Sequence, residues 1–163
     1  MRHPCQAGAA LLSSVTGSSA ATFSLAHPGG EGYRIIRVPT GSAGRTESLL
    51  AAIDGQTALI AVSHVLSEDG ERIGLVRLRA AADSVGARIF ADVTQSLGVL
   101  GIDLAASRPD YLAVHGYKWL LCPRGAAWLV TRHHDELCPL LPGWKTATLP
   151  LDNNSKEDSI WMA

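Results

Sequence analysis

The segment ARIFADVTQSLGVLGIDLAASRPDYLAVHGYKWLLCPRG, residues 87–125, decides the fold of this chain. It contains two short apolar runs that end at Asp92 and at His115, and Lys118 follows the second run in a short connection. Short apolar runs bounded by polar residues and glycine are typical of buried strands. In open α/β sheets, ligands bind outside the carboxyl ends of the strands. The segment therefore predicts an acid and an amine in one crevice.

An acid and a lysine in one crevice have a known use in enzymes. The lysine condenses with the aldehyde of pyridoxal 5'-phosphate (PLP), and the carboxylate keeps the pyridine nitrogen protonated, so that the ring accepts electrons. The competing interpretation of Lys118 is an ordinary surface lysine, the usual state of this residue type. Its position between two apolar stretches, just beyond a predicted buried strand, favours the chemical interpretation. The chain has only two other lysines, Lys145 and Lys156.

Two motifs surround this pair, DVTQ at residues 92–95 and HGYKW at residues 115–119. In this order they resemble the class V aminotransferases, a family that includes cysteine desulfurases, kynureninases and aminotransferase-like epimerases and lyases. Weaker likeness extends over roughly residues 34–144. The resemblance implies a PLP-dependent aminotransferase-like enzyme that acts on an amino acid, with PLP as its cofactor.

The resemblance also implies the residues of the site. Lys118 is the catalytic residue, which forms the aldimine and shuttles protons, and Asp92 binds the pyridine nitrogen. Gln95 contacts the ring oxygen, and His115 and Tyr117 donate hydrogen bonds to the phosphate. The cofactor-binding set that the resemblance predicts is Ser67, Asp92, Gln95, His115, Tyr117 and Lys118, and no metal ligand belongs to it.

Several of these residues have a plainer interpretation. Asp92 is also a favourable N-cap for the segment that follows it, and His115 is also explained as a histidine satisfied by backbone at a strand end. Ser67 departs from the family, since many relatives carry asparagine at its position. His64 is interpreted as a structural residue that does not touch the cofactor. The upstream phosphate-cradling turn and the residue that stacks on the ring have no match in residues 1–32.

Apolar periodicity predicts the elements around the site. It predicts βαβ units in which strands alternate with helices, and a short helical turn between the last two parallel strands. About ten residues separate the final two strands, fewer than a parallel crossover needs, so the last strand should run antiparallel to its neighbour. The expected strands are 33–38, 57–62, 87–91, 111–114 and 126–130, and the expected helices are 46–53, 75–86 and a turn at 103–106.

The fold class that follows is α/β. The resemblance implies a three-layer αβα arrangement around a mixed, mostly parallel sheet, as a partial large domain of a PLP-dependent transferase. With 163 residues the chain is much shorter than a complete enzyme of the family, so we expect a fragment. The predicted organisation is an irregular segment at 1–32, the partial large domain at 33–146 and a polar tail at 147–163.

Composition limits the partners of the chain. The net charge is −1 and the basic residues are scattered, which does not favour nucleic acid. No apolar run is long enough to span a bilayer. Cys5, Cys122 and Cys138 lack metal-ligand spacing, which indicates free thiols in a reducing, cytoplasmic compartment. The resemblance adds a small amino-acid substrate and, for a complete enzyme, a homodimer.

Three alternative functions remain open. A cysteine desulfurase or selenocysteine lyase is the first, although neither Cys122 nor Cys138 is placed like the reactive cysteine of a desulfurase. A non-catalytic remnant of the fold is the second. A dinucleotide-binding domain is the third, and it is disfavoured because Gly41 and Gly44 lack the Gly-x-Gly-x-x-Gly spacing.

Overall fold

The structure is a computed structural model, and it describes residues 10–13, 34–39 and 41–136. The chain divides into two compact units, Met1–Arg132 and His133–Ala163. Of the second unit, the described part contains one short 3-10 helix, η1, at His134–Glu136. The polar tail predicted at 147–163 lies outside the described residues.

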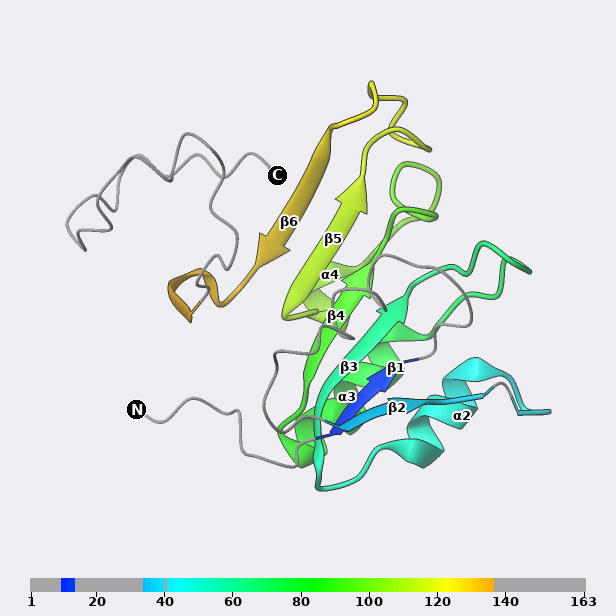
Figure 1. The fold of residues 1–163 in the computed structure, drawn as a ribbon, viewed down its shortest axis with the longest axis vertical. Coiled ribbons are helices and arrows are strands. Elements are labelled where there is room, and N and C mark those ends of the chain that lie inside the picture. Colours follow the sequence, from blue (N-terminus) through cyan, green and yellow to red (C-terminus); the bar gives the residue numbers. More distant parts are fainter. Residues whose placement is uncertain (1–9, 14–33, 40, 137–163) are drawn as a thin grey trace. The chain divides into compact units, whose positions relative to one another are not determined.

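The described strands of the first unit form one mixed sheet (Figure 1). Its order is β2-β1-β3-β4-β5-β6, and every neighbouring pair is parallel except β5 and β6. The antiparallel direction predicted for the last strand is confirmed. The strands are β1 Ala10–Ser13, β2 Arg34–Arg37, β3 Thr57–Ser63, β4 Arg88–Asp92, β5 Tyr111–His115 and β6 Ala127–Thr131.

Strand β1 was not predicted from the sequence. It lies between β2 and β3, within the segment 1–32 that we expected to be irregular. The strand has only four residues, and alanine, serine and glycine surround it, so no apolar alternation distinguishes it. Its register against β3 also shifts after Ala10. Pairing with strands on both sides defines β1, and the local sequence does not.

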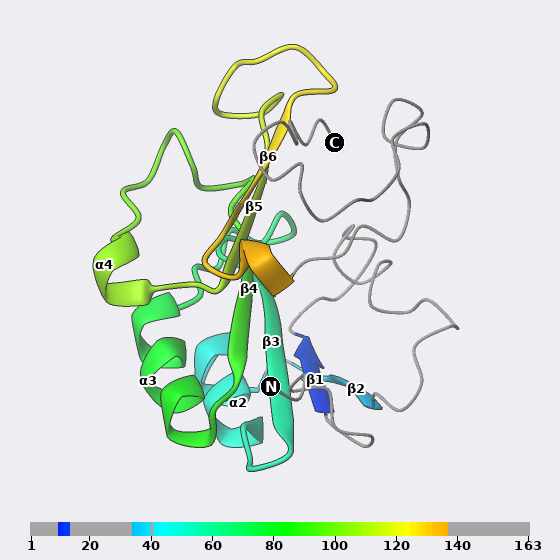
Figure 2. The ribbon, with the colours of Figure 1, turned by 90° about the vertical axis from the view of Figure 1, so that its left-hand side faces the viewer.

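The described helices lie on one side of the sheet (Figure 2). They are α2 Arg45–Ala52, α3 Leu75–Val85 and α4 Leu104–Ser107, close to the predicted positions. Helix α3 ends at Gly86, whose φ of 74° is the left-handed conformation that glycine adopts at little cost. Within the described residues, these helices form one of the two helical layers of the predicted three-layer arrangement.

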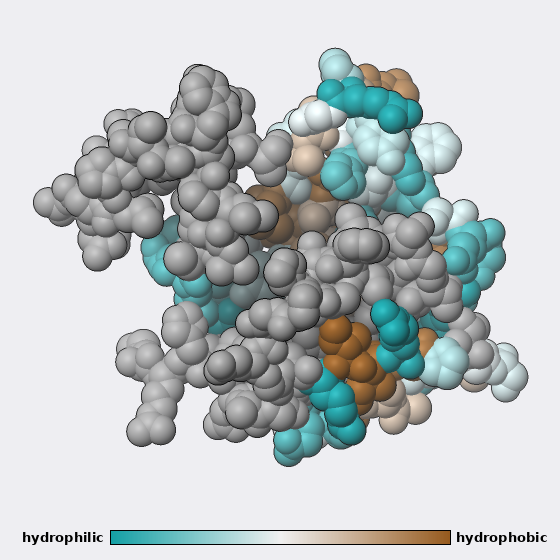
Figure 3. Space-filling model, in the orientation of Figure 1, coloured by the Kyte–Doolittle hydropathy of each residue, from teal (hydrophilic) through white to brown (hydrophobic). Residues whose placement is uncertain are grey.

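The core lies between this helical layer and the central strands. Strand β3 is buried along much of its length, whereas β6 exposes three successive residues, Trp128, Leu129 and Val130. Successive strand residues point to opposite faces, so both faces of β6 are open within the described part of the chain. Apolar surface is visible beside hydrophilic surface in Figure 3. The largest fully buried apolar side chains of the described residues are Leu49, Ile60, Ile73, Leu78, Ile89, Val62 and Val93.

A buried ion pair fastens α3 to the sheet at the start of β5. Arg79 on α3 donates to Asp110 Oδ2 at 2.8 Å and to the Ala87 carbonyl at 3.0 Å. The same Asp110 oxygen accepts from the Ile89 amide at 2.8 Å. Arg79 and Asp110 are only 6% and 7% exposed. The pair lies at the end of the strands opposite to the site described next.

Candidate active site at the carboxyl ends of the strands

Strands β3, β4 and β5 are parallel neighbours, so their carboxyl ends meet at one edge of the sheet, here called the carboxyl edge (Figure 1). Three connections leave this edge. We call residues 64–74 the β3 loop, residues 93–100 the β4 turn, and residues 116–126 the lysine loop. All six predicted cofactor-binding residues lie at this edge, at a strand end or in one of these connections.

Asp92 is the last residue of β4 and is half-buried. Its Oδ1 accepts a hydrogen bond from the Thr94 amide at 2.9 Å, and its carbonyl accepts one from the His64 amide at 2.8 Å. One carboxylate oxygen thus caps the β4 turn, which is the local role that the plainer interpretation gave it. The other oxygen, Oδ2, has no hydrogen-bond partner among the described residues. A half-buried carboxylate with one oxygen unused suits a cationic N–H donor such as a protonated pyridine.

Gln95 lies in the β4 turn and is half-buried. Its side chain makes no hydrogen bond with the described part of the chain, so its amide is available to a ligand. The preceding residue, Thr94, accepts a hydrogen bond from the His115 amide through its hydroxyl at 3.0 Å. Thr94 therefore joins the turn that carries Asp92 and Gln95 to the end of β5. Thr94 was not predicted from the sequence, although a hydroxyl two positions after an aspartate at a strand end is a recognisable turn signal.

The lysine loop is closed by backbone hydrogen bonds. The Gly116 amide donates to the Ala126 carbonyl at 2.8 Å, and the Cys122 amide donates to the Gly116 carbonyl at 3.0 Å. A side chain at Gly116 has no space, because its Cβ would lie 2.7 Å from the Trp128 ring and 2.9 Å from Cys122 Cβ. The loop is thus packed directly against β6.

Lys118 is half-buried in this loop, and its amine makes no ion pair with a described residue. The Nζ atom lies 5.9 Å from the centre of the Tyr117 ring, and the Arg124 guanidinium carbon lies 5.5 Å from the same centre. The His115 and Tyr117 rings are 6.0 Å apart between centroids, and both residues are exposed. The loop therefore gathers an unpaired amine, a second cation and two side chains that can donate hydrogen bonds. Such a set fits the phosphate and aldehyde of PLP.

The β4 turn and the lysine loop are in direct contact at Gly98. A Cβ built on Gly98 would lie 2.9 Å from the carbonyl oxygen of Trp119, the residue after Lys118. The φ of Gly98 is 97°, a conformation that L-residues rarely adopt. Only glycine lets the two connections approach this closely. This contact brings the connection that follows Asp92 and contains Gln95 against the one that contains Lys118.

Replacing Gly98 by alanine should therefore displace the lysine loop. We expect a loss of about 1–3 kcal/mol in the free energy of unfolding, from the backbone strain and from contact with an immobile carbonyl. Urea denaturation measures the loss, and Gly101→Ala is the matched control, because a Cβ at Gly101 meets no atom within 4 Å. Equal stabilities of the two variants would contradict the tight contact.

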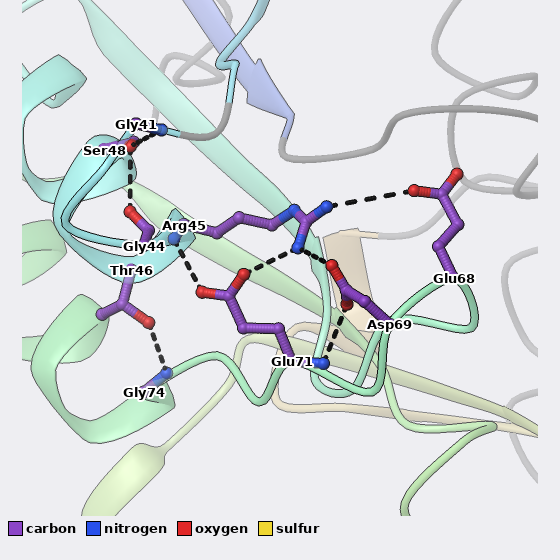
Figure 4. A network of polar contacts seen from close by, with 9 residues as sticks. All are labelled: Gly41, Gly44, Arg45, Thr46, Ser48, Glu68, Asp69, Glu71 and Gly74. Carbon is purple, nitrogen blue, oxygen red and sulfur yellow. Dashed lines mark hydrogen bonds and ion pairs between the residues drawn. The ribbon is translucent and has the colours of Figure 1, made fainter.

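Ser67 is the one predicted site residue in the β3 loop. It is exposed in the β3 loop and makes no hydrogen bond to the other five predicted residues within the described part of the chain. The loop itself is held by Arg45, at the start of α2, which pairs with Asp69 at 2.5 Å and with Glu71 at 2.6 Å (Figure 4). Hydrogen bonds to Asp69 first, and then to Glu71, raise the pKa of the Arg45 guanidinium. The fold thus fixes the loop without engaging Ser67.

His64 is buried at the start of the β3 loop, with 2% of its surface exposed. Burial lowers the pKa of its imidazole, and the neighbouring Arg72 lowers it further, so the ring is neutral at pH 7. The structural role predicted for His64 stays a prediction. The described residues contain no group of three side chains that could hold a metal ion, and none of their helices is long and apolar enough to cross a membrane.

Comparison with known proteins extends these observations. The chain is 37% identical over 98 residues to isopenicillin N epimerase from Amycolatopsis lactamdurans, covering 60% of the chain and 25% of that protein. It is 30% identical over 115 residues to cysteine desulfurase 2 from Trichormus variabilis, covering 69% of the chain and 29% of that protein. The chain thus spans less than a third of the length of these relatives.

Solved structures of related proteins have a similar fold. A cystine C-S lyase, C-DES, bound to its product cysteine persulfide matches with a TM-score of 0.70 and 25% identity, covering 86% of this chain and 40% of the lyase. The cysteine desulfurase CsdA from Escherichia coli matches with a TM-score of 0.69 and 20% identity, covering 79% of this chain and 33% of the desulfurase. The predicted fold class is therefore confirmed.

The family description Aminotransferase class-V matches residues 1–162, nearly the whole chain. This match agrees with the relatives, with the mixed sheet, and with the motifs at residues 92–95 and 115–119. The chain belongs to the class V aminotransferase family.

Proposed function

We propose that this chain carries the cofactor lysine and the pyridine-binding acid of a PLP-dependent enzyme that acts on amino acids. The contact between Gly98 and the residue after Lys118 is the observation that carries the proposal. It joins the two connections that hold Asp92 and Lys118 at the carboxyl edge, where α/β proteins bind their ligands. When bound, PLP supplies an aldehyde for the amine and a ring that withdraws electrons from the substrate carbon.

The side chains of this site have separate tasks in the proposal. Asp92 uses its free oxygen to hold a proton on the ring nitrogen, and the amide of Gln95 contacts the ring oxygen. Lys118 offers its unpaired amine to the aldehyde and later moves a proton at the substrate carbon. His115 and Tyr117 donate hydrogen bonds to the phosphate.

The relatives support the class of substrate that we propose. The solved structures include one protein in complex with cysteine and one with cysteine persulfide, and an amino acid is the substrate class that we propose here. Desulfuration is the second candidate, and the cysteine desulfurase among the relatives supports it. In the described part of the chain, however, the only thiol is Cys122, which is half-buried and lies 3.5 Å from the Leu120 carbonyl. Persulfide formation from cysteine would distinguish desulfuration from amino transfer, which needs a 2-oxo acid.

The setting of the enzyme is also part of the proposal. Cys122 is a free thiol in the structure, which supports a reducing compartment such as the cytoplasm. The whole protein is proposed to act as a homodimer, as the family resemblance implies. Both faces of β6 are open in the described part of the chain, which leaves apolar surface for further packing.

The role of Asp92 is tested by titrating the chain with PLP and following the absorbance of the bound cofactor. We expect weak binding, because no segment that cradles the phosphate was matched upstream. Asp92→Asn should lower the association constant about tenfold or more, since a hydrogen bond to a charged group contributes about 1.5–3 kcal/mol. Asp103→Asn is the matched control, because Asp103 only caps the exposed helix α4. Equal binding by Asp92→Asn and the original chain would refute the proposed role.

A further inference from the structure

Both ring nitrogens of the buried His64 are engaged in hydrogen bonds. Nδ1 lies 2.9 Å from the Ser96 hydroxyl, and Nε2 lies 3.2 Å from Nε of Arg72. Ser96 belongs to the β4 turn and is fully buried. His64 is therefore a bridge between the β3 loop, which contains Arg72, and the turn that carries Gln95.

The chemistry of the partners fixes the direction of these bonds. A guanidinium only donates, so Nε2 of His64 must accept, and the ring proton resides on Nδ1. Nδ1–H then donates to the Ser96 hydroxyl, which donates in turn to the Val93 carbonyl at 3.2 Å. The result is a directed chain of three hydrogen bonds from Arg72 to the first residue of the β4 turn.

The backbone of His64 reinforces this chain. Its amide donates to the Asp92 carbonyl at 2.8 Å, and its carbonyl accepts from the Ile73 amide at 2.8 Å. Ser96 also anchors the turn through its own backbone, because its amide donates to Val93 and its carbonyl accepts from Leu100. The conformation of the segment from Asp92 to Leu100 thus depends on His64 from two directions, through the strand end and through the Ser96 side chain.

We propose that His64 is a positioning residue, which through Ser96 holds the β4 turn so that Asp92 and Gln95 face the cofactor. This inference rests on the proposed function and assigns the cofactor geometry to a buried side chain that does not touch the cofactor. An apolar side chain of similar size would fill the space at His64 and leave the Ser96 hydroxyl without its donor. The hydrogen bonds of His64 therefore orient the β4 turn, in addition to the packing that its ring provides.

Three variants separate the effect of the His64 hydrogen bonds from the effect of its packing. His64→Leu fills the space without hydrogen bonds, and Ser96→Ala removes the contact from the other side with little change in volume. His64→Asn is the conservative variant, because its amide N–H can take the place of Nδ1–H. If His64→Leu does not fold, Ser96→Ala carries the test alone.

The first measurement is amide hydrogen exchange in the chain without cofactor. His64→Leu and Ser96→Ala should speed exchange at the Ser96, Leu97 and Leu100 amides about tenfold relative to amides of the β5 and β6 pair, the shift expected for one buried hydrogen bond. The double variant should be no worse than the worse single variant, since both remove the same contact. His64→Asn should restore most of the protection. Equal acceleration in the turn and in the strands would overturn the inference.

The second measurement is the association constant for PLP, with Asp92→Asn as a reference. His64→Leu should weaken PLP binding several-fold, and His64→Asn should weaken it less. The variant with the faster amide exchange in the β4 turn should bind PLP more weakly. If Asp92→Asn weakens binding and His64→Leu does not, the positioning role of His64 is wrong. If neither variant changes binding while the exchange result holds, the proposed function fails and the link between His64 and the turn stands.

Discussion

Replacing Asp110 by alanine should lower the free energy of unfolding by about 3–5 kcal/mol, the largest stability effect expected for one side chain of this protein. The variant removes the buried carboxylate that the Arg79 guanidinium contacts at 2.8 Å, and it leaves only the half-exposed Asp83, also at 2.8 Å, as an ionic partner. It also removes the acceptor of the Ile89 amide. A buried charge that loses its partner costs far more than a surface charge that does. Urea denaturation followed by circular dichroism measures the effect.

Arg77→Ala is the matched control on the same helix. Arg77 pairs with Glu47, but both side chains are largely exposed, so water replaces the lost contact and the change in stability should be small. A double variant, Arg79→Met with Asp110→Leu, should be more stable than Asp110→Ala, because it removes both buried charges together. If Asp110→Ala and Arg77→Ala unfold at the same urea concentration, the ion pair does not hold α3 to the sheet.

Replacing Lys118 by alanine should remove nearly all borohydride-stable attachment of PLP, the largest functional effect that we expect. Lys118 is half-buried, and its amine makes no ion pair in the described part of the chain and lies 5.9 Å from the centre of the Tyr117 ring. A lysine held beside its reaction partner reacts far more readily than one in bulk water. Intact mass spectrometry after reduction gives the number of attached groups.

Lys145→Ala and Lys156→Ala are the controls for this experiment, since with Lys118 they complete the lysines of the chain. Each should keep the attachment at the level of the original protein. Lys118→Arg tests the chemistry further, because it retains the positive charge but a guanidinium does not condense with the aldehyde. If PLP is still attached in Lys118→Ala, the proposed role of Lys118 is wrong.

Much of the fold followed from local sequence. The buried strand β3 and the helix α3 are marked by their apolar patterns, and the direction of β6 followed from the length of one connection. Strand β1 was not predicted, because a strand of four residues is too short to show a clear apolar alternation. The ion pair of Arg79 with Asp110 joins residues 31 positions apart, and the local sequence around either residue does not predict such a partner.

Part of the candidate site could likewise be predicted from local sequence, and part could not. Asp92 and Lys118 were predicted because each follows an apolar run, and the structure brings their connections together. The close approach at Gly98 and the bridge from His64 to Ser96 are tertiary contacts, which depend on how neighbouring strands are paired. Ser67 was predicted from the family pattern alone, and it is exposed in the β3 loop. The chemical roles of all six residues stay predictions.

The identity of the cofactor lysine is tested most directly by mapping the reduced attachment in the original protein. The chain is saturated with PLP, reduced with borohydride and digested, and the modified peptides are identified by mass spectrometry. We predict that the modification lies on the peptide containing Lys118, and that Asp92→Asn lowers its yield. Modification concentrated on Lys145 or Lys156, or spread equally over the three lysines, would contradict the assignment of this site.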